Sequence, residues 1–210
     1  MRPEELRFEQ ALWRLGVTGA AEDRLRQALE STRIFDDGTY LHSLRNAVLS
    51  TTIAKHARLN ARALLWPGAL HDDGKRLISK PEIVRITGTF TEEDKAIMDT
   101  HVMLGFDSLV AQGFLFTAHV MKYHHRFGPR PYPDPLPELP SFWRGRDREF
   151  QVYGRVLALA DYYDALIYRK NDKFDGIPMT AEERQQRYID GNLDEERVVR
   201  LLIERGALVF

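Results

Sequence analysis

Apolar residues recur at helical spacing along most of this 210-residue chain, and no other sequence feature constrains the fold as strongly. Leu41, Leu44 and Val48 lie on one face of a predicted helix over residues 40–58. Further helices are predicted over 4–16, 20–32, 61–73, 91–104, 106–112, 114–125 and 148–169, with two more starting at a Thr180 cap and near Asn192 and the last ending at Gly206. No segment alternates polar and apolar residues convincingly, so we predict an all-α fold.

The segment 126–140 is the clear exception to this helical pattern. It contains six of the ten prolines, and proline cannot continue a helix because it lacks the backbone N–H and clashes with the preceding turn. We therefore predict an extended loop, long enough to have a function of its own.

Composition excludes several kinds of function. The chain has 30 basic and 31 acidic side chains, so its net charge gives no reason to expect a nucleic-acid polymer or a membrane surface as partner. It contains no cysteine, which excludes disulfides and thiolate metal ligands. The charged N-terminal segment is unlike a signal peptide, and no apolar run is long enough to span a membrane, so we expect a cytoplasmic protein.

Histidines and aspartates suggest a metal centre. Of the seven histidines, five occur late or centrally on apolar helices or beside a second possible ligand. The candidate ligands are His42, His71, Asp72, His101, His124, His125 and Asp161. Nitrogen and oxygen ligands without sulfur suit divalent iron or manganese first, with zinc, nickel and magnesium as alternatives. Seven ligands exceed what one tetrahedral ion with an open position needs, so we expect two ions that share Asp72.

Two histidines are excluded from this set on geometry. His56 follows His42 by fourteen residues, which is about 21 Å along a helix and too far for one site. His119 points roughly 140° away from His124 around its helix. The neighbours His124 and His125 can both bind metal only if the helix ends there, and the following Gly128-Pro129 indicates that it does.

The segment HDDGK at 71–75 strengthens the metal hypothesis. It places His71 and Asp72 at the end of an apolar helix, where a buried carboxylate is costly unless a metal or another partner compensates it. Gly74 permits a turn, and Lys75 is placed to bind a phosphate oxygen. The alternative interpretation is an ordinary helix end with an acidic cap.

Five segments together resemble one known family. They are HSLRNA at 42–47, HDDGK at 71–75, EEDKAIMDTHVMLG at 92–105, YHHRFGPRPYP at 123–133 and RVLALADYYDAL at 155–166. In this order they are similar to the HD-domain superfamily, and specifically to its HD-GYP branch. The resemblance implies a helical bundle with a central metal site over 40–185, preceded by a helical extension over 1–39 and followed by a C-terminal helix within 186–210.

The resemblance also implies an activity, the hydrolysis of a small nucleotide substrate, typically cyclic di-GMP, by a hydroxide that bridges two metal ions. One ion would be held by His42, His71, Asp72 and Asp161, and the other by Asp72, His101, His124 and His125. Lys75 would steady the scissile phosphate. Substrate contacts are implied for Arg126, Arg130, Tyr132 and Arg169.

The chain departs from the branch at three places. Arg126 follows the paired histidines where the branch has an acidic residue, and Pro131 replaces the glycine before Tyr132-Pro133. Gly38 stands where some members carry a glutamate for a third metal, which favours two ions. The segment ALIYRKNDKF replaces an arginine-proline-tyrosine element.

Three alternative functions are therefore open. The chain could be an HD phosphohydrolase for another nucleotide or a phosphomonoester, a two-iron enzyme that activates oxygen, or a non-catalytic protein that binds a cyclic dinucleotide or a partner through the 126–140 loop. Residues 1–39 are too short for a sensor domain. We therefore expect regulation by a protein partner, by homodimerisation or by ligand supply.

Overall fold

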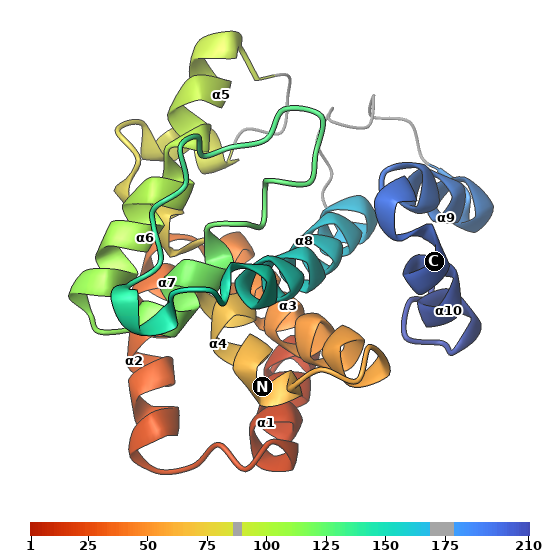
Figure 1. The fold of residues 1–210 in the computed structure, drawn as a ribbon, viewed down its shortest axis with the longest axis horizontal. Coiled ribbons are helices and arrows are strands. Elements are labelled where there is room, and N and C mark those ends of the chain that lie inside the picture. The colour runs from red at the N-terminus through yellow and green to blue at the C-terminus, as the bar shows by residue number, and fades with distance from the viewer. Residues whose placement is uncertain (86–89, 169–178) are drawn as a thin grey trace.

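The computed structural model describes residues 1–85, 90–168 and 179–210, and within these ranges it contains helices and no strand (Figure 1). This confirms the predicted all-α class. The α-helices are α1 (Pro3–Arg14), α2 (Ala20–Phe35), α3 (Asp37–His56), α4 (Ala61–Leu70), α5 (Glu92–Asp99), α6 (His101–Ala111), α7 (Leu115–Met121), α8 (Asp147–Tyr168), α9 (Ala181–Asp190) and α10 (Glu196–Glu204). In the described part of the chain, no helix has both the length and the apolar character needed to cross a bilayer.

Helices α3 and α8 form the centre of the bundle. Helix α3 packs against α1, α2, α4 and α8, and buried side chains such as Leu44, Leu64 and Leu157 join these helices in one core. Helices α9 and α10 lie at the C-terminal half of α8, where Tyr188 of α9 stacks on Tyr162 and donates to the Leu159 carbonyl oxygen (Figure 1). The result is a rigid frame in which residues distant in sequence meet at the middle of the bundle.

Helix starts follow side-chain caps that the sequence carries. The Asp36 carboxylate accepts a hydrogen bond from the Thr39 backbone N–H at 2.7 Å, which starts α3 immediately after α2 and sets the position of His42. Thr180 and Glu183 form the predicted capping box at the start of α9.

The predicted helix break at Gly105 is wrong. Helix α5 ends at Asp99, α6 starts at His101, and Gly105 lies in the middle of α6. The glycine is needed for packing rather than for termination, because the Gly74 turn lies directly against it. A Cβ atom added at Gly105 would sit 3.0 Å from the Gly74 nitrogen and 3.1 Å from Met121 Cε, and one added at Gly74 would sit 2.5 Å from the Gly105 nitrogen and overlap the His101 carbonyl oxygen. The chain instead turns at Thr100, which places His101 at the start of a new helix.

Two helices end earlier than predicted. The helix predicted over 61–73 ends at Leu70, and the one predicted over 114–125 ends at Met121. Pro67 lies inside α4. His71 and the pair His124-His125 therefore lie just past helix ends, where the last carbonyl groups lack partners within the helix and can accept side-chain hydrogen bonds.

Candidate metal centre

The structure brings all seven predicted ligands together. His42 comes from α3, His71 and Asp72 follow α4, His101 starts α6, His124 and His125 follow α7, and Asp161 comes from α8. All of them are buried except His125, which is partly exposed. A polar cluster of this size is costly inside a protein unless its charges and lone pairs have partners.

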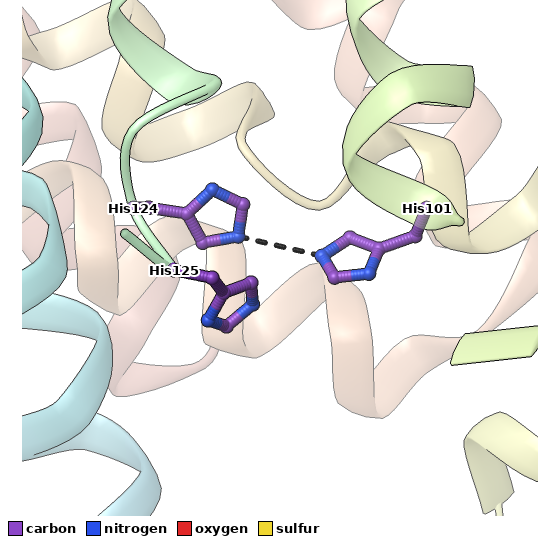
Figure 2. A group of neighbouring side chains, drawn as sticks. All are labelled: His101, His124 and His125. Atoms are coloured by element: carbon purple, nitrogen blue, oxygen red, sulfur yellow. Dashed lines mark hydrogen bonds between the residues drawn. The ribbon is translucent and has the colours of Figure 1, made fainter. Parts of the chain in front are cut away.

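The ligands form two groups joined by one carboxylate. One group is His42, His71 and Asp161, and the other is His101, His124 and His125 (Figure 2). Asp72 lies between them. Its Oδ2 atom is 3.3 Å from His42 Nε2 and 3.5 Å from His71 Nε2, whereas its Oδ1 atom is 3.3 Å from His101 Nε2. Each carboxylate oxygen thus faces a different group, as a bridging ligand requires.

Backbone carbonyls orient three of the five imidazole rings. The Nδ1 atoms donate to carbonyl oxygens three residues earlier: His71 to Gly68 at 3.0 Å, His101 to Met98 at 2.6 Å and His124 to Met121 at 2.5 Å. A carbonyl only accepts hydrogen bonds, so Nδ1 carries the proton in each ring and Nε2 keeps its lone pair in the neutral form. The free nitrogen of each ring points into the centre.

This arrangement fits divalent metal ions. His101 Nε2 and His124 Nε2, joined by the dashed line in Figure 2, lie 3.3 Å apart. In the neutral rings their lone pairs face each other, and only a shared proton or a metal ion between them relieves the repulsion. His42 Nε2 and His71 Nε2 are similarly close, at 3.2 Å. The donor set of nitrogen and oxygen without sulfur is one that first-row metals accept.

The first group carries charge. Burial opposes ionisation of Asp72, but Lys75, His71 and His101 outweigh it and hold its pKa well below the usual range. Burial likewise opposes ionisation of Asp161, but the neighbouring His42 and His71 hold its pKa well below the usual range. Burial also opposes protonation of His42, but the surrounding carboxylates raise its pKa to about 10. In the metal-free protein a proton on His42 therefore offsets part of the negative charge.

Two rings of the second group, His124 and His125, are held in the neutral form. Burial, reinforced by His71 and His101, lowers the pKa of His124 to about 3. Burial, reinforced by His124 and His101, also holds the pKa of His125 well below its usual value. These rings are therefore ready to bind a metal at neutral pH without first losing a proton.

Lys75 lies in the site but is engaged with Asp72. Its Nζ atom is 2.5 Å from Asp72 Oδ2, and the side chain is buried. The ammonium has three donors, and this bond uses one of them. The predicted contact between Lys75 and a substrate phosphate stays a prediction. In the structure, Lys75 balances the negative charge of the Asp72 carboxylate.

The predicted loop residues have different surroundings. Tyr132 stacks on His125 with ring centroids 4.6 Å apart, so it borders the second group. Arg126 donates to the Pro133 carbonyl oxygen at 2.7 Å and shapes the loop. Arg130 is exposed and pairs with Glu92 at 3.7 Å. Arg169 lies outside the described residues.

Both excluded histidines lie apart from the two groups. His119 is buried against Phe106, Trp143 and Phe150, so it is a core residue. His56 is the last residue of α3, far along that helix from His42.

Sequence analysis missed Asp164 and Arg45 as supporting residues. Asp164 Oδ2 accepts from His42 Nδ1 at 2.6 Å, and Arg45 binds the same carboxylate. The available signal was the spacing of Asp161 and Asp164, because carboxylates three residues apart share one helix face.

A family model described as "HD domain" matches residues 39–166. The chain belongs to the HD domain family. It is 27% identical over 202 residues to a Cyclic di-GMP phosphodiesterase of Thermotoga maritima, covering 87% of this chain and 50% of that protein. The chain thus spans about half the length of this curated relative.

A solved HD domain shows the same fold. The HD domain of the L. monocytogenes phosphodiesterase PgpH superposes with a TM-score of 0.54 at 17% identity, covering 84% of this chain and 87% of the other. HD domains are metal-dependent, and membership of this family together with the buried histidine and aspartate groups supports the predicted class of metal-dependent phosphohydrolase.

Proposed function

We propose that this HD domain protein is a phosphodiesterase of the HD-GYP branch that uses two divalent ions, iron or manganese first, to hydrolyse a cyclic dinucleotide, with cyclic di-GMP as the leading substrate. The observation that carries the proposal is the orientation of Asp72, whose two oxygens face two separate histidine groups. A second support is the similarity to a relative named as a cyclic di-GMP phosphodiesterase.

The chemistry follows from the charge distribution of the site. Bound divalent ions would supply Lewis acidity toward a water molecule and toward the phosphate oxygens. His42, His71, Asp72 and Asp161 would hold one ion, and Asp72, His101, His124 and His125 the other. The protein's own contribution is to fix these ligands in a buried, preorganised frame, where electrostatic stabilisation of a charged transition state is strongest.

Lys75 and Tyr132 have proposed roles beside the ligands. The Lys75 ammonium is fixed by Asp72 and has donors left for a phosphate oxygen. Tyr132 covers His125 from the loop side, which limits access of bulk water to the second group. Both would contact a bound phosphodiester.

The loop also favours a second candidate, an HD phosphohydrolase for a different nucleotide or a phosphomonoester. Arg126 replaces the acidic residue of the branch and directs its guanidinium to the Pro133 carbonyl and to Asp134, 3.5 Å away. The loop is thus shaped by contacts that the branch's own sequence would not make. Such a change in the loop would alter which substrate fits the site and would leave the metal ligands themselves unchanged.

A turnover assay tests the proposal. The 210-residue protein is purified without oxygen, its metal content is measured, and the same sample is incubated with cyclic di-GMP, cyclic di-AMP and p-nitrophenyl phosphate. Linear product from cyclic di-GMP, lost in His71→Ala and kept in His56→Ala, is the expected result. Turnover of the monoester alone would support the second candidate, and absence of hydrolysis in metal-loaded protein would refute both.

Regulation by a partner or by homodimerisation belongs to the same proposal. Trp13 on α1 and Ile34 on α2 are 78% and 77% exposed, and exposed large apolar side chains are common where proteins meet. Light scattering across a concentration series, with and without cyclic di-GMP, would detect self-association.

A further inference from the structure

A buried carboxylate lies directly behind one of the candidate metal ligands. Asp164 Oδ2 accepts a hydrogen bond from His42 Nδ1 at 2.6 Å, and both side chains are more than nine-tenths buried. His42 Nε2, on the other side of the same ring, faces Asp72 and Asp161 at 3.3 and 3.2 Å. The imidazole is therefore held between a supporting carboxylate and the centre.

Arg45 holds Asp164 in place. Its Nε atom is 2.6 Å from Asp164 Oδ1, and its Nη2 atom is 2.9 Å from Asp164 Oδ2. This fork engages both carboxylate oxygens, which fixes the plane of the carboxylate as well as its position. The guanidinium itself is stacked on Tyr168 at 4.2 Å and lies 3.8 Å from Glu4 of α1.

The arrangement differs from that of the other ligands. His71, His101 and His124 use neutral backbone carbonyls of their own turns. His42 uses a charged side chain 122 residues away, and a carboxylate behind an imidazole makes the ring a stronger donor to a metal as well as fixing its orientation. The support therefore acts on one of the two ligand groups.

We propose that the Asp164–Arg45 pair is a positioning device for the metal ion held by His42, His71 and Asp161, and that it leaves the ion at His101, His124 and His125 unaffected. This inference rests on the two-ion centre of the proposed function and adds to it a residue pair that touches neither ion. It predicts that the two ions respond differently to the loss of one remote carboxylate.

Cobalt titration tests the inference. The metal-free 210-residue protein is titrated with Co²⁺ alone, and visible absorption and bound metal after dialysis are both recorded. In Asp164→Asn, a substitution of nearly the same shape, one of the two Co²⁺ equivalents should bind about 10- to 100-fold more weakly, the usual effect of losing such a partner. The other equivalent should change less than about twofold.

The same helix provides a matched control. Arg155 of α8 binds Asp194 through a similar fork, at 2.9 Å and 2.5 Å, and Asp194 touches no candidate ligand. Asp194→Asn removes an arginine–carboxylate pair that supports no histidine of the candidate metal centre. Both Co²⁺ equivalents should bind this variant as they bind the wild type.

Each outcome decides the question. Unchanged Co²⁺ binding in Asp164→Asn, or equal weakening of both equivalents, overturns the inference. If Asp164→Asn does not fold, Arg45→Lys takes its place, because it keeps the charge and loses the fork. Selective weakening of one equivalent in that variant supports the inference, and unchanged binding overturns it. A wild-type protein that binds fewer than two Co²⁺ ions overturns the two-ion proposal itself, without any substrate being present.

Discussion

Replacing Gly74 by alanine should disrupt the metal centre without touching a ligand. The added Cβ atom would lie 2.5 Å from the Gly105 nitrogen and 2.8 Å from the His101 carbonyl carbon, and closer still to the carbonyl oxygen. Carbon atoms in good contact are about 3.5–4.0 Å apart. All three neighbours are backbone atoms, so no side-chain rotation relieves the overlap, and α6 must move by about 1 Å.

The loss of stability caused by Gly74→Ala can be estimated from this movement of α6. Overpacking of a well-packed interior costs about 1–3 kcal/mol. Metal–ligand distances tolerate changes of only about 0.2 Å, and His101 moves with the start of α6. We therefore expect Gly74→Ala to lower the unfolding free energy by about 2 kcal/mol and to weaken or abolish metal binding at the proposed site of His101, His124 and His125.

The assay combines urea denaturation with metal analysis. Gly128→Ala is the matched control, because its Cβ would meet nothing within 4 Å although the residue lies near the same histidines. That variant should behave as the wild type does. A Gly74→Ala protein with wild-type metal content and a stability change below about 0.5 kcal/mol would refute the reasoning.

Three further predictions concern single side chains. Asp72→Ala should lose both proposed ions, because each carboxylate oxygen faces one ligand group. His56→Ala should keep both. Elemental analysis measures the metal content of the two variants, and metal loss from His56→Ala would contradict our ligand set. The pKa of His119 is lowered from 6.5 to about 4, mainly by burial and to a smaller extent by the charge of Lys122. The folded state therefore disfavours the protonated form of His119. Its contribution to stability is complete above pH 6.5 and is lost as pH falls toward 4, by about 3 kcal/mol. His119→Gln should be less sensitive to acid in urea denaturation at pH 7 and pH 4.5, and an equal acid sensitivity would contradict this. Lys122 donates to the Pro137 carbonyl, so Lys122→Met should free the 126–140 loop and speed its cleavage by trypsin after Arg126. An unchanged cleavage rate at Arg126 would contradict this role of the hydrogen bond between Lys122 and Pro137.

Much of the fold and the choice of candidate ligands could be predicted from the sequence, because both depend on local patterns, and the structure brings these candidates together. Helical periodicity locates α3 and α8, and the doublet His71-Asp72 stands out at the end of an apolar helix. The role of Gly105 could not be predicted, because a glycine inside a helix and a glycine that ends one are alike in sequence. Only the approach of the Gly74 turn distinguishes them.

The supporting residues were missed for a similar reason. Asp164 resembles any acidic residue of an amphipathic helix, and its partner His42 is 122 residues away. Nothing in the spacing of Arg45 and Asp164 shows that they meet. Contacts of this kind depend on how α3 and α8 pack together, which the pattern of either helix does not specify.

Three of the ligand rings take their orientation from carbonyls three residues earlier. Each of these rings is aligned within a single turn of chain, as soon as that turn forms. Among these four rings, only His42 takes its orientation from a distant helix, because its partner Asp164 lies on α8. During folding the rings of His71, His101 and His124 can thus be oriented early, whereas the His42 ring is oriented only when α8 has docked on α3. The orientation of the His42 ring therefore depends on the packing of α8 against α3, whereas the orientation of the other three rings does not.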